Sequence, residues 1–153
     1  MIQKTRTTAG SGAIEINAIM QILPHRYPLL LVDRVLDCVP GKHITGLKNI
    51  TRCEPFLANA AHDQRAMSHL LVIEALAQLS VILAFRTLGL QPNGNELMFF
   101  AGIDNAKFHD TARPGDQLLS DPKSAEFASW WAGFMRGRKS KTGWSSICRC
   151  WQR

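Results

Sequence analysis

One apolar stretch of helical length, from Leu70 to Phe85, constrains the fold of this chain more than any other feature. Its apolar residues fall at nearly every angle around a helix, so a helix here has no side suited to water and must be covered by other structure. The one acidic residue in it, Glu74, is costly to bury unless it is paired or used. Gln78 lies one helical turn further along the same side. The stretch therefore predicts a central helix with a narrow polar stripe, which is the first candidate for chemistry.

A membrane-spanning helix is the alternative reading of this stretch, and two features argue against it. A span needs roughly 20 consecutive apolar residues, and a carboxylate near its middle is expensive. The segment after Met1 also lacks the basic and apolar regions of a secretory signal. We therefore expect a cytoplasmic protein.

Chain length and cysteine content favour one reduced, globular domain. The 153 residues are enough for a single domain with a real core. The four cysteines have neither the spacing of a disulfide framework nor paired CxxC metal spacing. We interpret them as small apolar residues in a reducing compartment, and the CxC at residues 148–150 as weak support for zinc. The cysteines are Cys38, Cys53, Cys148 and Cys150.

The positive charge of the chain is concentrated at its carboxyl end. Residues 1–119 hold 11 Lys and Arg against 10 Asp and Glu, whereas residues 120–153 hold 7 against 2. The same end contains all four tryptophans, without a helix or strand period. A net charge of +6 suggests an acidic partner. Because no recognisable nucleic-acid-binding module accompanies it, we expect no nucleic-acid binding.

Local patterns around the apolar stretch predict one further helix and several strands. Residues 1–13 are polar and rich in Gly, Ser and Thr, which indicates a loose tail. Helical spacing that stops at Pro24 predicts a short helix, and apolar or alternating stretches bounded by Pro and Gly predict strands. The predicted elements are helices at Ile14–Leu23 and Ser68–Leu88, strands at Leu29–Val39, His43–Thr51 and Leu97–Ile103, and a strand after the turn at Pro114–Gly115.

This order of elements indicates an α+β domain. The first two predicted strands are separated by a turn at Pro40–Gly41 and are expected to pair as a hairpin. One long apolar helix among antiparallel strands favours a sheet that curls around the helix, because each must bury an apolar face.

Five motifs follow one another along residues 14–119: LPHRYPLLLVDRV, KNIT with EPF just after it, VIEALAQ, FAGIDNAKF and PGDQLL. In order and spacing they resemble the (3R)-hydroxyacyl-[acyl-carrier-protein] dehydratases of the FabZ type. The resemblance implies a hotdog fold over this range, with an antiparallel sheet wrapped around the central helix. It also implies a dimer with both active sites at the subunit interface, often as three dimers in a hexamer. The implied reaction removes water from a 3-hydroxyacyl thioester on acyl carrier protein, giving the trans-2-enoyl thioester without a cofactor.

This chemistry needs a base for the C2 proton, an acid for the departing C3 hydroxyl, and donors for the thioester carbonyl. Glu74 in VIEALAQ matches the family's catalytic carboxylate, and since burial favours the neutral carboxyl we expect it to donate the proton. The backbone N–H of His69 is expected to bind the carbonyl at the helix start, where the helix dipole helps. The His69 side chain replaces a glycine of the family and occupies space left empty there. Gln78 is expected to contact the substrate.

The histidine of the family's Gly-His-Phe-Pro motif is missing. An ungapped alignment between EPF and VIEALAQ puts NAAH there, so Ala60 stands at the catalytic position. His62 lies two residues on and is the candidate substitute base, since proton transfer needs heavy atoms within about 3 Å or one bridging water. The alternatives are a loop histidine without a role, and His69 as the base. His25, in LPHRYP, resembles a structural position of the family.

The carboxyl end departs from the resemblance over residues 120–153. The family continues with two long strands joined by an acidic-Gly turn, and this pattern is absent. Residues 138–153 can be back-translated into a nucleotide sequence with codons chosen for the purpose. When the first two bases are dropped, this sequence encodes Glu-Val-Glu-Asp-Gly-Leu-Val-Val-Asp-Leu, which is typical of strand, turn and strand. A shift of reading frame near Leu119 and Ser120 would explain the charge, the tryptophans and the lost period together. The nucleotide sequence of the gene tests this hypothesis.

Two classes of function remain open at this point. One is a dehydratase of fatty acid synthesis, on which an acidic carrier protein docks beside basic residues. The other is a catalytically impaired relative that binds acyl chains or pairs with an active subunit, or a degenerate product without stable function. Glu74 favours the first class and Ala60 the second. Hydration of a crotonyl thioester separates the two.

Overall fold

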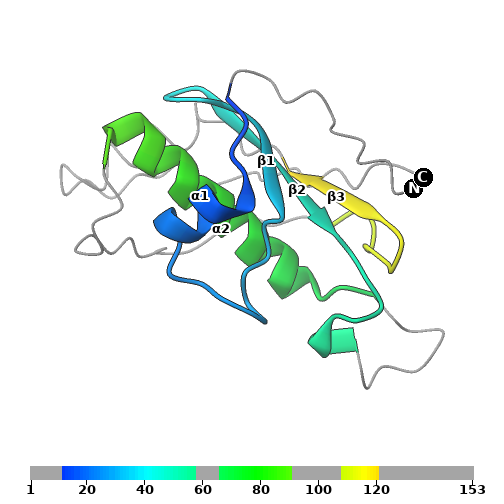
Figure 1. Cartoon of the computed structure of the whole chain (residues 1–153). Coiled ribbons are helices and arrows are strands. Elements are labelled where there is room, and N and C mark those ends of the chain that lie inside the picture. The colour runs from blue at the N-terminus through cyan, green and yellow to red at the C-terminus, as the bar shows by residue number, and fades with distance from the viewer. Residues whose placement is uncertain (1–11, 58–65, 91–107, 121–153) are drawn as a thin grey trace, which may run out of the picture.

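A computed structural model describes residues 12–57, 66–90 and 108–120 of the chain (Figure 1). Within these ranges two α-helices and a short 3-10 helix accompany three strands. The elements are α1 (Ile16–Ile22), β1 (Arg34–Val39), β2 (His43–Asn49), the 3-10 helix η1 (Pro55–Leu57), α2 (His69–Leu88) and β3 (Gln117–Ser120). The predicted α+β class is confirmed.

The three strands form one antiparallel sheet in the order β1-β2-β3. β1 and β2 are the predicted hairpin, and the turn between them uses Gly41 at a φ of 71°, where a side chain would strain the backbone. β3 pairs with the other edge of β2, which places Leu119 opposite Leu47. The strand predicted after the turn at Pro114–Gly115 is therefore also confirmed.

Helix α2 has a defined cap at each end. The Ser68 hydroxyl oxygen accepts a hydrogen bond from the N–H of Leu70 at 3.3 Å. At the other end Gly89 is left-handed, with a φ of 65°, as is common for a glycine that ends a helix. These caps confirm the predicted central helix, with Ser68 as its capping residue rather than its first residue.

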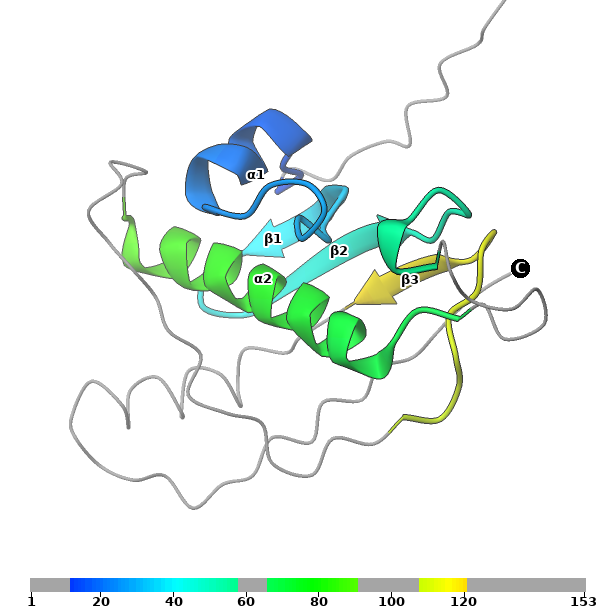
Figure 2. The same ribbon diagram turned by 90° about the horizontal axis from the view of Figure 1, so that it is seen from below.

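α2 runs along one face of the sheet, and α1 lies next to it on the side of β1 (Figure 2). The approach of α2 to β2 is close because Gly46 has no side chain. A Cβ at this position would stand 2.9 Å from Leu79 Cγ and nearer still to both methyl groups of that leucine. The core between helices and sheet includes the buried residues Ile14, Ile19, Leu23, Val32, Val35, Cys38, Ile44, Leu79, Ile82 and Leu83.

The first part of the strand predicted at Leu29–Val39 is irregular, so the prediction is wrong there. Its first two N–H groups donate to the carbonyl of Arg26, at 2.8 and 3.0 Å. The N–H of Leu31 donates to the side-chain oxygen of Gln78, at 3.0 Å. Because a turn and a helix side chain take these donors, they cannot join a neighbouring strand, and β1 begins only at Arg34.

Two other predicted elements are shorter than expected. Ile14, expected in the first helix, instead exchanges two backbone hydrogen bonds of 3.0 Å with Val35 in an isolated bridge. The second strand ends at Asn49 rather than Thr51. The N–H of Ile50 donates at 2.9 Å to the carbonyl of Asp116, which lies in the turn before β3.

The described residues cover most of α2 but not all of it. Ten of its residues are buried, whereas Leu70 is 75% exposed and Leu88 44%. The described part of the chain therefore leaves Leu70, in the apolar stretch, uncovered, and its cover by a partner subunit stays a prediction. By length and composition alone α2 could cross a membrane, with a mean hydropathy of 1.8, but the core helix of a soluble protein passes the same test. Its packing against the sheet is that of a core helix.

Several predictions concern residues outside the described ranges. They are the strand at Leu97–Ile103, Ala60 and His62 near the missing motif, the pair Cys148 and Cys150, and the terminal segment from residue 121 on. These stay predictions.

Candidate active site

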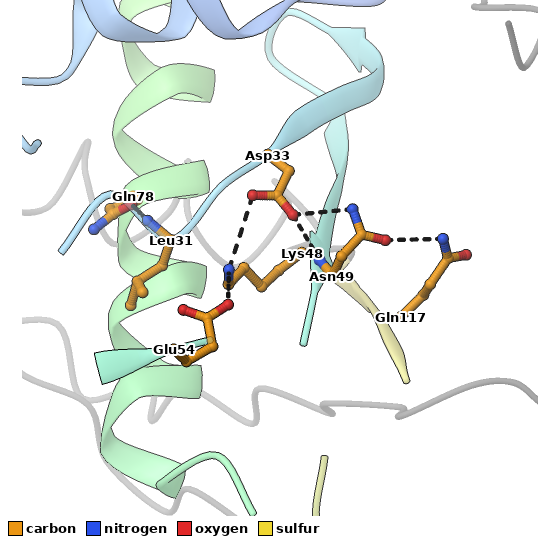
Figure 3. Close-up of polar contacts among 7 residues, drawn as sticks. All are labelled: Leu31, Asp33, Lys48, Asn49, Glu54, Gln78 and Gln117. Carbon is orange, nitrogen blue, oxygen red and sulfur yellow. Dashed lines mark hydrogen bonds and ion pairs between the residues drawn. The ribbon is translucent and has the colours of Figure 1, made fainter. Parts of the chain in front are cut away.

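Glu74 and Gln78 form the polar stripe predicted on α2. Gln78 is 1% exposed, and its amide nitrogen donates a hydrogen bond to Glu74 Oε1 at 2.9 Å. The same nitrogen donates to the carbonyl of Leu29 at 2.7 Å, and the amide oxygen accepts from Leu31, whose position beside Gln78 is drawn in Figure 3. Gln78 is thus held between α2 and the segment before β1, and it orients the Glu74 carboxylate. Its contact with a substrate stays a prediction.

His25 joins this group, although the sequence assigned it only a structural position. Its Nε2 lies 3.3 Å from Glu74 Oε1, and its side chain is 33% exposed. The imidazole comes from the loop between α1 and β1, far from Glu74 in the sequence. In the sequence, His25 stands out only as a histidine between Pro24 and Pro28. The spacing of residues along the chain cannot connect it to a helix that begins more than forty residues later.

The Glu74 side chain is more accessible than the apolar stretch suggests. It is 39% exposed. It lies on the same side of α2 as Leu70, one turn earlier, which is mostly exposed. The described part of a single protomer therefore leaves this carboxylate partly open, and its role as proton donor stays a prediction.

His69 begins α2, and its ring stacks on that of Phe108. The ring centroids are 4.2 Å apart and the planes differ by 7°. Its Nε2 is buried without a hydrogen-bond partner among the described residues. The His69 N–H lies in the first helical turn, where N–H groups have no acceptor within the helix. The Ser68 hydroxyl already caps the N–H of Leu70, so the His69 N–H is in a position suited to an incoming carbonyl.

A charged cluster ties β2 to η1 and to the segment before β1 (Figure 3). The Lys48 ammonium lies 2.7 Å from Glu54 Oε1 and 3.8 Å from Asp33 Oδ1. The second oxygen of Asp33 accepts from the backbone N–H of Asn49 at 2.6 Å. Because Lys48 is only 7% exposed, the carboxylates offset the cost of burying its charge. The cluster fixes η1, the last described element before residue 58.

Neither a metal site nor a disulfide is present in the described part of the chain. No set of three or more His, Cys, Asp or Glu side chains there could hold a metal ion. Cys38 and Cys53 are both free. Burial raises the pKa of the Cys38 thiol, while the charge of Arg86 acts in the opposite direction. Cys38 is buried, as expected of a small apolar residue, whereas Cys53 is exposed.

Comparison with known proteins shows the family of this chain. The sequence model of the FabA-like domain matches residues 23–123. The chain belongs to the FabA-like family. It is 48% identical over 108 residues to the 3-hydroxyacyl-[acyl-carrier-protein] dehydratase FabZ of Aromatoleum aromaticum, which covers 71% of this chain and 74% of that protein. The protein of the same name from Polaromonas sp. is 47% identical over 108 residues, which cover 71% of this chain and 74% of that protein. The one from Shewanella loihica is 46% identical over 112 residues, which cover 73% of each chain.

Membership of the FabA-like family confirms the resemblance found in the motifs, and with it the hotdog fold. The described sheet and α2 are consistent with this fold, since an antiparallel sheet packs along one long helix. The matched range includes Glu74, Gln78 and His25.

Proposed function

We propose that this chain catalyses the dehydration of (3R)-hydroxyacyl-acyl-carrier-protein to trans-2-enoyl-acyl-carrier-protein in fatty acid biosynthesis. Its relatives at 46% to 48% identity carry the name of this dehydratase. The observation within the chain that supports the proposal is the Glu74 carboxylate, which is 39% exposed and held in place by Gln78. The protein is then a hydro-lyase.

The reaction breaks two bonds of the substrate, C2–H and C3–O. A base takes the C2 proton, and Glu74 gives its own proton to the C3 hydroxyl, which leaves as water. Negative charge develops on the thioester carbonyl as C2 loses its proton. The N–H of His69, at the positive end of the α2 dipole, is suited to stabilise this oxygen.

The identity of the base is the open part of this mechanism. Ala60 has a methyl group where the family has its histidine, and a methyl group cannot accept a proton. We propose His62 as the substitute base, because it is the nearest imidazole in the sequence to the missing position. If no substitute acts, the chain is an impaired relative that binds acyl chains or pairs with an active subunit.

The proposed partners are the acyl carrier protein and a second copy of the chain, in a cytoplasmic dimer or a hexamer of three dimers. The described protomer leaves Leu70 and Glu74 accessible on one side of α2. A second copy over this side would bury both side chains.

A hydration assay with a crotonyl thioester of acyl carrier protein or of coenzyme A tests the proposal. We expect turnover by the parent chain, and a loss of at least about tenfold in Glu74→Gln, which keeps the shape but removes the proton donor. Glu15→Gln is the matched control, since Glu15 lies on the surface, 3.3 Å from Arg34 and with a 66% exposed side chain. The absence of turnover in the parent would refute the dehydratase. Equal turnover in both variants would refute the role of Glu74.

A further inference from the structure

The Glu74 carboxylate is held through one of its two oxygens. The Gln78 amide donates to Oε1 at 2.9 Å, and His25 Nε2 lies 3.3 Å from the same atom. The second oxygen, Oε2, has no partner among the described residues. This arrangement leaves Oε2 as the carboxyl oxygen open to a substrate group.

The backbone on both sides of His25 is anchored, so its ring is not a freely moving surface side chain. The guanidinium of Arg26 donates to the carbonyl of Leu23 at 2.8 Å and to that of Met20 at 3.0 Å, at the end of α1. It also donates to the carbonyl of His25 itself at 2.6 Å. These bonds join the histidine to the end of α1, which packs against α2.

Stability does not account for the placement of this ring. Ion pairs between side chains that are a third or more exposed contribute little to stability, and His25 and Glu74 are 33% and 39% exposed. The other ring nitrogen, Nδ1, is buried without a hydrogen-bond partner among the described residues, which costs free energy. The ring turns Nε2, and not the buried Nδ1, toward Glu74.

We propose that His25 is a positioning residue for Glu74: together with Gln78 it holds Oε1 and leaves Oε2 directed to the reacting hydroxyl. This inference rests on the proposed dehydratase function. His25 lies outside the motif that has lost its histidine, and it would act on Glu74 without contacting the substrate. Among the described residues the charged group in contact with the ring is Glu74, while Arg26 binds the backbone carbonyl of His25.

Two substitutions of His25 distinguish positioning from simple structure. His25→Leu removes both ring nitrogens, whereas His25→Gln keeps a nitrogen donor near the position of Nε2. We expect His25→Leu to lower kcat of crotonyl-thioester hydration about tenfold with KM within about twofold of the parent, since a misplaced acid slows the chemical step rather than binding. We expect His25→Gln to recover most of the loss.

The matched controls are His43→Leu and His43→Gln. His43 is also paired with a carboxylate: its Nε2 lies 2.8 Å from Asp37 Oδ2, within hydrogen-bond distance, with both side chains 39% exposed, in the β1–β2 hairpin. Both control variants should keep the parent kcat. A rise in KM at unchanged kcat, or an equal loss of kcat in His25→Leu and His43→Leu, would overturn the proposal.

Nuclear magnetic resonance of the ¹⁵N-labelled full chain separates this proposal from the function on which it rests. The resonances of the His25 ring nitrogens should move in Glu74→Gln but not in Glu15→Gln, because Nε2 lies 3.3 Å from Glu74 Oε1. A parent without turnover would refute the dehydratase and would leave this reading of the pair intact. His25 resonances that do not change in Glu74→Gln would refute the positioning role even in an active enzyme.

Discussion

Replacement of Gln78 by leucine removes three hydrogen bonds from the site while it nearly preserves the side-chain volume. The Gln78 amide accepts from the N–H of Leu31 and donates to the carbonyl of Leu29 and to Glu74. Leucine can satisfy none of these groups. The perturbation is therefore a loss of polar partners, without the cavity that a smaller residue would leave.

The size of the effect follows from how far each group is buried. The N–H of Leu31 is fully buried with Gln78, so its lost bond should cost about 1–3 kcal/mol. Leu29 is 51% exposed, and water can reach its carbonyl, so this loss should be closer to about 0.5–1.5 kcal/mol. The added apolar burial of leucine returns about 1 kcal/mol. The free energy of unfolding should fall by about 0.5–3.5 kcal/mol. In a chain of this size each kcal/mol lowers Tm by roughly 2–4 °C.

Thermal unfolding and amide hydrogen exchange measure this prediction, with Ser80→Ala as the matched control. Ser80 is also buried on α2, but its hydroxyl donates only to the carbonyl of Leu76 one turn earlier, so its loss should cost less than about 1 kcal/mol. In Gln78→Leu the exchange of the Leu31 N–H should accelerate more than that of the strand residues. If Gln78→Leu is no less stable than Ser80→Ala and Leu31 stays protected, the reasoning is refuted.

Two further substitutions test the missing histidine and the charged cluster. Ala60→His should raise crotonyl-thioester hydration by about 10²-fold or more, which is the usual contribution of a general base. The control Ala61→His places the imidazole one residue after the motif's histidine position and should give no gain. Equal gains in the two variants would show that the alignment is wrong. Lys48→Met should lower the free energy of unfolding, measured by chemical denaturation, by about 3 kcal/mol, because it leaves the 12% exposed Glu54 carboxylate without its cation. The double variant with Glu54→Leu should regain much of this loss. A Lys48→Met variant as stable as the parent would contradict a stabilising role for the pair.

Predictions from the sequence succeeded where the deciding interactions are local. α2 was located to within one residue because an apolar run, a serine cap and a terminal glycine all lie within it or next to it. The β1–β2 hairpin followed from a turn at Pro40–Gly41 between two strand-like segments. The motifs also identified the family, since their order survives along most of the chain.

The failures concern segments whose partners lie far away in the sequence. The stretch from Leu29 to Leu31 has the composition of a strand, but its donors bind a turn and the side chain of Gln78, 47 residues from Leu31. His25 could not be linked to Glu74 by any spacing, because their contact depends on how α1 packs against α2. The accessibility of Glu74 likewise depends on which side of the helix the sheet covers.

The sequence by itself determined the central helix, the hairpin, the family and the identity of Glu74 as the candidate acid. Periodicity, caps and turns act over a few residues, so they can be read along the chain. Only the tertiary structure decided that Gln78 and His25 converge on Oε1 of this carboxylate and leave Oε2 without a partner among the described residues. That arrangement arises from the packing of two helices and a loop, and the free energy of such packing depends on surfaces that come together only in the folded chain.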